Sequence, residues 1–328
     1  MRRIISRVSS MAMALALVSG LFGSLDVAAR GPGLGEPGQQ DSAGAGRGVT
    51  AEEFDRWMTE LSNWSRWGDE DELGTLNLIT AAKRVQAAEL VEAGITVSLS
   101  RRLVLGQQAT FQRGFDNVFA LGEPVLGERA AWIEELHQIG YHGSPLTHLD
   151  ALCHVAWDGM TYNGRRFDDT ATAARGCTKN GVAPLKAGIV TRGILMDLPD
   201  AGRVTIDDIE AWERGSGVTI SSGDALFLRT GGRGGYDNSI MPFIKERDLA
   251  LIIADGGVVD GGAIEGRTTL PMHMFTLVAL GMPLIDGVDL DALAETAGML
   301  DRHEFMFVVA PLPVDTGAGS AVNPVAIF

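Results

Sequence analysis

The sequence is poor in cysteine and in aromatic side chains. Only 2 of its 328 residues are Cys, and aromatic residues make up 6% of the chain. A single cysteine pair cannot supply the framework of a small disulfide-stapled domain, so a chain of this length must rely on a buried apolar core. Cys153 and Cys177 could pair in an oxidising compartment, but Cys153 is also explained as a small buried hydrophobe, so the sequence leaves open whether the two cysteines pair.

Positive charge is also scarce. The chain has 27 Lys and Arg residues against 42 Asp and Glu residues, which gives a formal net charge of -15. The acidic residues are spread along the chain without long runs. A field of this sign repels phosphate groups and anionic headgroups, so we expect no nucleic-acid partner and no membrane-surface partner. A small-molecule substrate is the better candidate.

The motifs of several large enzyme classes are missing. The chain has no Gly-x-Ser-x-Gly nucleophile elbow, no His-Glu-x-x-His pair and no Walker phosphate-binding loop. These absences argue against a serine hydrolase of the α/β-hydrolase type, a zincin protease and a P-loop enzyme. The glycines of residues 231–235 (GGRGG) could bind an anion through backbone amides, but a surface loop is the simpler interpretation.

The first 29 residues differ from the rest of the chain. Three Arg residues near the N-terminus precede an apolar stretch at residues 11–22, and residues 27–29 (VAA) offer a cleavage site. The apolar stretch is short for a membrane span, so residues 1–29 are predicted to be a signal peptide, with a retained anchor as the alternative. Residues 30–48 are predicted to be a disordered linker. We expect an exported protein, periplasmic or secreted, with no membrane segment after cleavage.

Residues 49–328 are predicted to form a single catalytic domain of the α/β class. Thr50 and Glu53 form a capping-box pattern at the start of an amphipathic helix, and Thr80 is the predicted N-cap of the next. Helices and strands are mixed along the chain, which favours an α/β fold over segregated regions. Further helices are expected at residues 80–92, 205–214, 270–280 and 289–296. Strands are expected at residues 95–105, 187–198, 224–230, 249–254 and 304–309.

Histidine is concentrated in one short segment. The chain has six His residues, and His142, His148 and His154 flank Asp150. His148 and Asp150 are two residues apart, so both point to the same face of an extended segment, and His154 shares that face if the strand continues. Imidazoles and a carboxylate that converge on one point suit Zn²⁺ or Mn²⁺. The arrangement also suits hydrolysis, in which a metal activates water and a histidine moves protons.

The histidine-rich segment and several other runs of the sequence resemble a known family. Residues 147–150 (THLD) followed by His154 are similar to the core motif of the cyclase family of metal-dependent hydrolases, which includes bacterial kynurenine formamidases and isatin hydrolases. The resemblance extends from Trp67 to the C-terminus. It includes residues 67–77 (WGDEDELGTLN), 223–231 (GDALFLRTG), 271–273 (PMH) and 286–290 (DGVDL).

The resemblance implies a fold, a set of site residues and an assembly. The implied fold is the swivelling β/β/α arrangement of the cyclase family, assembled as a homo-oligomer such as a dimer or tetramer. His148 would bind one metal ion, and Asp150 would bridge to a second ion where two are present. His273 would serve the second ion, Asp286 would bridge or close the ligand shell, and His154 would be the general acid/base. The cofactor would be one or two divalent ions, Zn or Mn.

Two positions depart from the family pattern. Ser144 stands where the family has its first histidine. His142, two residues earlier, could reach in as the additional ligand or could be a hydrogen-bonded histidine at a strand end, and both interpretations remain open. Asp286 stands where the family usually has Glu, and it is shorter by one methylene. Together these departures are compatible with a single metal ion, or with weaker binding at one of two sites.

The sequence therefore predicts a metal-dependent hydrolase that cleaves an amide or a lactam. The resemblance implies an aryl formamide or an isatin-like ring as the substrate class. An alternative is an exported metal-containing binding module with weak or no catalysis. A lactonase or a dehydratase could also use the same residues.

Overall fold

The computed structural model describes most of the chain. Contacts divide the chain into Met1–Asp41 and Ser42–Phe328, and every described residue lies in the second unit. The predicted signal peptide and nearly all of the predicted linker lie outside the described residues, so both stay predictions. The described residues are 48–104, 115–121, 133–143, 146–255 and 259–328.

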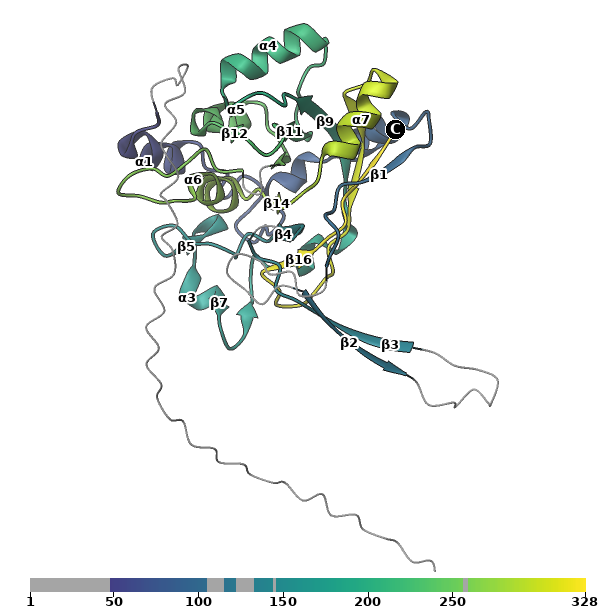
Figure 1. The fold of residues 1–328 in the computed structure, drawn as a ribbon. Helices are drawn as coiled ribbons and strands as arrows, with labels where there is room; N and C mark the ends of the chain where they lie inside the picture. Colours follow the sequence, from purple (N-terminus) through teal and green to yellow (C-terminus); the bar gives the residue numbers. More distant parts are fainter. Residues whose placement is uncertain (1–47, 105–114, 122–132, 144–145, 256–258) are drawn as a thin grey trace, which may run out of the picture. The chain divides into compact units, whose positions relative to one another are not determined.

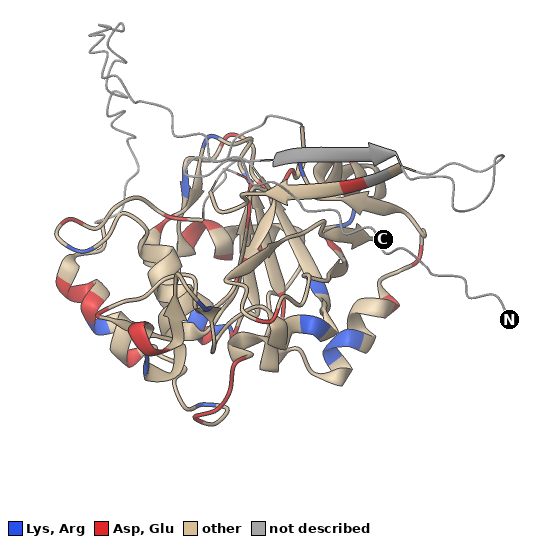
Figure 2. Cartoon of the chain, turned by 90° about the horizontal axis from the view of Figure 1, so that it is seen from below, with Lys and Arg blue, Asp and Glu red and all other residues tan. Residues whose placement is uncertain are grey.

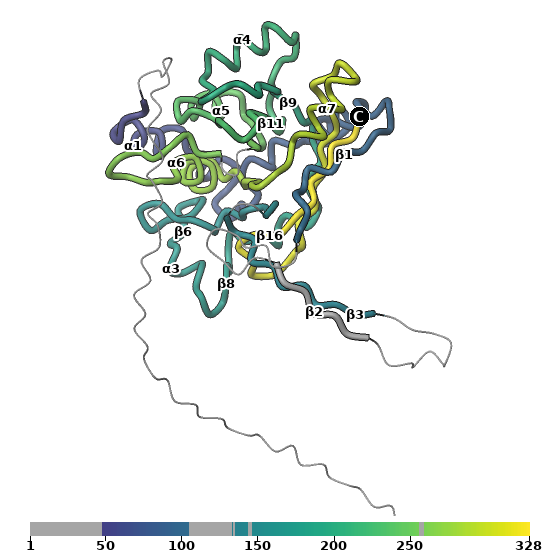
Figure 3. Tube along the Cα trace, viewed as in Figure 1, coloured from purple at the N-terminus to yellow at the C-terminus, as the bar shows by residue number. Residues whose placement is uncertain are grey.

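A six-stranded mixed sheet runs through the folded unit (Figure 1). In spatial order its strands are β1 (Thr96–Ser98), β17 (Val325–Ile327), β15 (Glu304–Val309), β9 (Ile189–Asp197), β11 (Ala225–Arg229) and β13 (Leu251–Ala254). The last three are parallel to one another, and the remaining neighbours pair antiparallel. Figure 3 shows the yellow C-terminal end of the chain beside the early strand β1, with which β17 pairs.

Helices pack against this sheet. Most of them lie between strands in the sequence, as an α/β fold requires. The α-helices are α1 (Ala51–Glu60), α2 (Ala81–Glu89), α3 (Phe167–Thr170), α4 (Ile206–Ser216), α5 (Met241–Glu246), α6 (Pro271–His273) and α7 (Asp291–Leu300). A π-helix, η5 (Met274–Leu280), continues α6. Short 3-10 helices are η1 (Gly74–Leu78), η2 (Tyr162–Gly164), η3 (Ala183–Ala187) and η4 (Asn238–Ile240).

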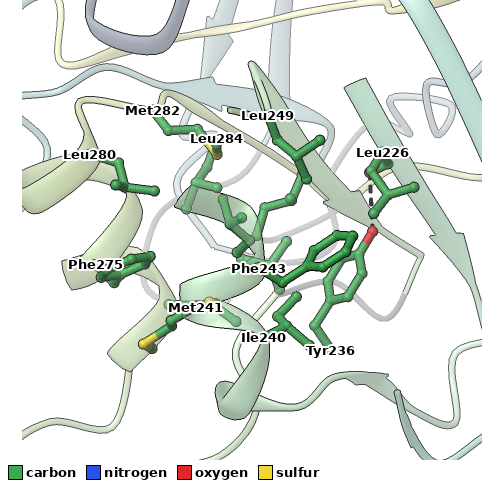
Figure 4. Close-up of a cluster of buried hydrophobic side chains, with 14 of the residues drawn as sticks. Leu226, Tyr236, Ile240, Met241, Phe243, Leu249, Phe275, Leu280, Met282 and Leu284 are labelled. Carbon is green, nitrogen blue, oxygen red and sulfur yellow. Dashed lines mark hydrogen bonds between the residues drawn. The ribbon is translucent and has the colours of Figure 1, made fainter. Parts of the chain in front are cut away.

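Two hydrophobic clusters occupy the two faces of the sheet. Because successive residues of a strand point to opposite faces, Leu226 of β11 packs in one cluster and Phe227 in the other. The first cluster includes buried side chains of α1, α4, α5 and η5. Figure 4 shows part of it, where the Tyr236 hydroxyl donates to the carbonyl of Leu226 at 3.1 Å. The second cluster includes side chains of β15 and α7.

The predicted starts of the first two helices are confirmed. Thr50 and Glu53 form both halves of a capping box at α1, with hydrogen bonds of 3.0 and 3.2 Å. Thr80 caps α2 by accepting from the backbone N–H of Lys83 at 3.1 Å. The strand expected at residues 95–105 is shorter than predicted, because β1 covers only Thr96–Ser98 of the described part.

A second, three-stranded antiparallel sheet lies beside β13. Its order is β14 (Leu284–Asp286), β4 (His148–Asp150) and β16 (Gly319–Ala321). The register places His148 opposite Asp286, although the two residues lie far apart in the sequence. All residues of β4 and β14 are buried. Backbone pairing therefore brings two candidate ligands from distant segments onto one small sheet.

Four two-stranded ribbons complete the described strands. The ribbon of β7 and β8 is the one that matters for the site below, because it contains Cys177. The ribbons are β2 (Phe115–Leu121) with β3 (Ile133–Ile139), β5 (Met160–Thr161) with β6 (Arg165–Arg166), β7 (Ala171–Thr172) with β8 (Gly176–Cys177), and β10 (Arg203–Val204) with β12 (Gly235–Tyr236).

Charged residues are distributed over several elements. Figure 2 shows Asp and Glu on helices and loops, with Lys and Arg among them. Some pairs join distant segments, such as Arg66 with Asp248 at 2.6 Å and Arg267 with Asp55 at 2.7 Å. Within the described part of the chain, no helix is both long enough and apolar enough to cross a membrane.

One run that carries the family resemblance, residues 223–231, supplies a buried ion-pair network. Asp224 is 0% exposed, and its carboxylate lies 2.6 Å from the Lys83 ammonium and 2.9 Å from Nε of Arg192. Arg192 also donates to Glu304 at 2.8 Å. Lys83 and Arg192 are themselves buried. Because these charges have lost most of their water, each depends on its partners for stabilisation.

We predict that Asp224→Asn destabilises the fold strongly. The substitution leaves Lys83 and Arg192 as buried cations without their shared carboxylate, which costs about 3–5 kcal/mol of unfolding free energy. Urea denaturation measures the loss. Glu60→Gln is the matched control, since Glu60 pairs with Arg56 on an exposed helix surface and its loss should leave stability nearly unchanged. Equal stability of the two variants would contradict the prediction.

Candidate metal centre

Four of the predicted ligands meet in one buried place. His148 and Asp150 come from β4, Asp286 from the adjacent strand β14, and His273 from the first turn of α6. Pro271 begins that turn, and the fixed φ of proline suits the first position of a helix. All four side chains are at most 4% exposed. The sequence predictions for these positions therefore converge in space.

The carboxylate of Asp150 lies at the middle of this group. Its Oδ1 is 2.8 Å from Nδ1 of His142 and 3.5 Å from Nε2 of His148. Its Oδ2 is 3.8 Å from Nε2 of His273 and 3.9 Å from Nε2 of His154. One carboxylate thus faces four imidazoles, two on each oxygen.

Hydrogen bonds on the outer side of two rings determine which nitrogen faces the centre. Nδ1 of His148 lies 2.7 Å from the carbonyl oxygen of Leu146, to which it donates. Nδ1 of His273 lies 2.6 Å from the Asp260 carboxylate and donates to it. These partners assign the tautomers, and both rings present the Nε2 lone pair to the centre. A lone pair in that position is what a metal ligand needs.

The donors form two groups that share Asp150. His142, His148 and Asp150 make the first group, and Asp150, His273 and Asp286 make the second, with the ligand atoms of each group within 4.8 Å of one another. In the described part of the chain, Oδ1 of Asp286 is the one buried side-chain polar atom without a hydrogen-bond partner. A buried carboxylate oxygen without a partner is costly, and a cation bound there would satisfy it. The residues present therefore fit a divalent metal.

The electrostatics of the centre favour positive charge between the carboxylates. Burial acts to raise the pKa of Asp150, but the hydrogen bond with His142 and the charges of nearby imidazoles lower it to about 2. Burial raises the pKa of Asp286. Burial acts to lower the pKa of His273, yet its bonds to Asp260 and Asp286 raise that pKa well above the usual value. The carboxylates of Asp260 and Asp286 thus favour positive charge at the place where a metal ion would bind.

His142, whose role the sequence left open, reaches the centre. Gly143 follows it with φ of 90°, a conformation that favours glycine, and this turn directs the His142 ring to Asp150. Tyr141 packs on the same ring at 4.7 Å. A Cβ at Gly319 would lie 3.2 Å from the His142 ring, so glycine there leaves the ring its space. Ser144, the departure from the family pattern, lies outside the described residues.

His154 also faces the centre, but not by the route that the sequence suggested. The strand does not continue to this residue: β4 ends at Asp150, and the chain turns so that the N–H of His154 donates to the carbonyl of Ala151 at 2.9 Å. The ring stacks on His142 at 4.0 Å with an interplanar angle of 4° and is 27% exposed. Burial lowers the pKa of His154 to about 4, against the attraction of Asp150 and helped by the other imidazoles. The ring is therefore neutral at pH 7.

The structure answers the question that the sequence left open for the two cysteines. Cys153 and Cys177 form a disulfide, with their Cα atoms 6.2 Å apart. The N–H of Cys153 donates to the carbonyl of Asn180 at 2.9 Å, so the turn after β4 lies against the segment that follows β8. This backbone contact brings the two Cα atoms within the range that a disulfide requires. The sequence showed the two residues but not their proximity.

Sequence reasoning missed Asp260. This residue is 5% exposed, and its carboxylate accepts from the N–H of Met272 at 2.7 Å as well as from the His273 ring. It therefore caps the first turn of α6 and orients a candidate ligand at the same time. The only local signal is an acidic residue in a glycine-rich stretch, GGVVDGG, which does not indicate a contact 13 residues further on.

The site has the features of a buried metal centre on a mixed α/β fold. The Cyclase family model matches residues 83–265, more than half of the chain. This protein therefore belongs to the Cyclase family. The matched range contains the segment from His142 to His154 and Asp260, and it ends shortly before His273. None of the curated proteins gives a significant match.

This chain is similar to several solved structures, and the first two described here show the same fold. A crystal structure described as a novel cyclase is 25% identical, has a TM-score of 0.73, and the match covers 82% of this chain and 100% of that one. An isatin hydrolase bound to the product analogue thioisatinate is 17% identical with a TM-score of 0.50, covering 76% and 99%. Isatin hydrolase A from Ralstonia solanacearum is 17% identical with a TM-score of 0.49, covering 71% and 92%. The predicted cyclase-type α/β fold is confirmed.

We predict that Asp260→Asn weakens metal binding. An amide at this position can donate to Nδ1 of His273, which would move the ring proton to Nε2 and remove the lone pair that faces the centre. Loss of such an outer partner typically costs 10–100-fold in metal affinity. Competition with a chromophoric chelator measures the affinity. Asp315→Asn, at an exposed position, is the control. Equal affinities of both variants and the wild type would show that Asp260 does not orient the ligand.

Proposed function

We propose that this protein is a metal-dependent hydrolase whose centre holds two divalent ions, Zn or Mn. The unpartnered Oδ1 of the buried Asp286 is the observation that carries the proposal. Support also comes from the two ligand groups that share Asp150, since a carboxylate between two imidazole sets suits a bridging position. Imidazole and carboxylate donors match the preferences of both metals.

The residues of the centre have two roles in the proposed hydrolysis: some would hold the metal, and His154 would transfer a proton. A divalent ion bound between these ligands would supply Lewis-acid chemistry, making water nucleophilic at neutral pH and polarising a carbonyl group. His154 is neutral, partly exposed and directed at the centre, so it can accept the proton that water loses on attack. The same ring then gives that proton to the leaving nitrogen as the C–N bond breaks. The products are a carboxylic acid and an amine, and the imidazole ends as it began.

The proposed substrates are amides and lactams next to an aromatic ring, such as an aryl formamide or an isatin-like compound. The family resemblance supports this class, and the isatin hydrolase with its bound product analogue shares the fold of this chain. A hydrolysis assay with aryl formamides, isatin and matched esters tests the proposal. Turnover that disappears on chelation and returns with Zn²⁺ or Mn²⁺ is the expected result.

The second candidate function is an exported binding module that keeps the metal without efficient catalysis. The replacement of two usual family residues, at Ser144 and Asp286, favours it. Elemental analysis together with the same substrate panel separates the two candidates. One or more equivalents of bound metal, with no hydrolysis of any amide, lactam or ester, would favour the binding module.

The proposed place of action is outside the cytoplasm. The predicted signal peptide at residues 1–29 supports export. The Cys153–Cys177 disulfide also supports it, because disulfides persist in oxidising compartments and are rare in the cytosol. Fractionation of cells that produce the full chain tests this proposal.

We predict that His154→Ala abolishes turnover while metal content stays near that of the wild type. General acid/base groups contribute about 10²–10⁴-fold to a rate, so kcat should fall by that amount. Elemental analysis of the purified variant checks the metal. If metal is lost together with activity, His154 is a ligand and not the proton carrier.

We predict that His142→Ala changes the metal count. His142 supplies one of the three donors of the first ligand group, so its loss should reduce bound metal from about two equivalents to about one. Mass spectrometry under native conditions and elemental analysis both measure this. His137→Ala is the matched control, because that side chain is about half exposed on β3. An unchanged metal count in His142→Ala would assign His142 to hydrogen bonding alone.

A further inference from the structure

The ring of His154 has little to hold it in place. In the part of the chain that the structure describes, this ring makes no hydrogen bond, and its nearest charged neighbour, the Asp150 carboxylate, is 3.9 Å away. Stacking on His142 restricts the tilt of the ring but allows it to slide. The position of His154 therefore depends on the backbone of the turn that carries it, residues 151–154.

Nothing in the residue types of this turn makes it stiff. The residues ahead of His154 are Ala151, Leu152 and Cys153, and none of them fixes a backbone dihedral as proline would. The backbone of the turn is held by three hydrogen bonds, from Ala151 to the carbonyl of Ala318, from Cys153 to that of Asn180, and from His154 back to that of Ala151. The Cys153 side chain adds the one covalent link, to Cys177. Cys153 is 1% exposed, whereas the next side chain, His154, is 27% exposed and faces the centre.

The other end of the disulfide, Cys177, lies in a segment that several hydrogen bonds hold in place. The N–H of Cys177 donates to the carbonyl of Thr316 at 2.8 Å, and the residue pairs with Ala171 in the β7–β8 ribbon. Three residues further on, Asn180 is 0% exposed and donates to the carbonyl of Tyr162 at 2.9 Å. The residues to which Cys177 is joined by these bonds are not candidate metal ligands, so the disulfide links the turn of His154 to a segment outside the centre.

We propose that the Cys153–Cys177 disulfide is a positioning element for His154, and that the oxidised chain is the fully active form. The inference rests on the proposed function, in which His154 carries the proton. Without the disulfide, the turn keeps its hydrogen bonds but the ring can move out of line with the reacting atoms. Misplacement of a catalytic group by about 1 Å can cost 10²-fold in rate.

Cys177→Ala is the sharpest test, because it breaks the bond without changing the residue beside His154. We expect kcat to fall by about tenfold or more, with KM and metal content near those of the wild type. The absorption spectrum of the Co(II)-loaded variant should match that of the Co(II)-loaded wild type, because the ligands are untouched. Cys153→Ala and the double variant should show the same loss, since each removes the same bond. An unchanged kcat in Cys177→Ala overturns the inference.

A second set of variants shows whether the bond acts through His154. In the His154→Ala background, Cys177→Ala should change the residual rate by less than about twofold, because the group to be positioned is absent. A full additional loss in that background overturns the inference. Failure of the proposed function looks different: the wild type would hydrolyse nothing in the panel, or His154→Ala would retain wild-type turnover whatever the state of the cysteines.

The wild-type chain provides a test that needs no cysteine variant to fold. Chain produced in a reducing cytoplasm should carry two free thiols by thiol titration and should have its full metal content. Oxidised glutathione then forms the bond, as two protein thiols become one disulfide and two glutathione thiols are released. We expect kcat to rise as the thiol count falls to zero. A kcat that is the same before and after oxidation overturns the inference.

Discussion

The Asp150 carboxylate is 1% exposed and has imidazole nitrogens of four histidines within 3.9 Å. A buried carboxylate is stable only when positive charge or hydrogen-bond donors replace its lost water. This requirement explains why most of the histidine in the chain gathers at one place. Hydrogen bonds on the far side of two rings set their orientation, because the Asp260 carboxylate and the Leu146 carbonyl hold Nδ1 of His273 and of His148 and so turn Nε2 of each ring to Asp150.

The register of the small sheet brings the candidate ligands of β4 and β14 together. β4 lies between β14 and β16, and its pairing places His148 opposite Asp286 on one side and Ala321 on the other. A shift by one residue would turn every ligand of β4 to the opposite face. The small sheet is fully buried along β4 and β14, so its register is fixed by packing as well as by hydrogen bonds. The ligand geometry thus depends on the same apolar core that stabilises the fold.

Local patterns predicted the local features of this protein and little beyond them. The capping box at Thr50 and the central strands could be predicted, because the spacing of apolar residues and the chemistry of helix caps depend only on neighbouring residues. The cluster around Asp150 was visible because it lies within one short segment. The role of Asp260 was not visible, because its partner His273 lies 13 residues further along the chain, in the first turn of α6. The pairing of Cys153 with Cys177 stayed open for the same reason, since their proximity is a property of how two distant turns pack.

Two candidate ligands, His142 and Asp286, reach the centre from positions that depart from the family pattern. His142 enters from an earlier position because Gly143 adopts a positive φ and Gly319 leaves space for the ring. Asp286 is shorter than Glu, but it sits directly opposite His148 in the sheet, and its Oδ2 lies 3.1 Å from Nε2 of His273. A shorter side chain can still reach when the backbone that carries it comes closer. In the folded chain, the two substitutions therefore leave His142 and Asp286 within reach of Asp150 and His273.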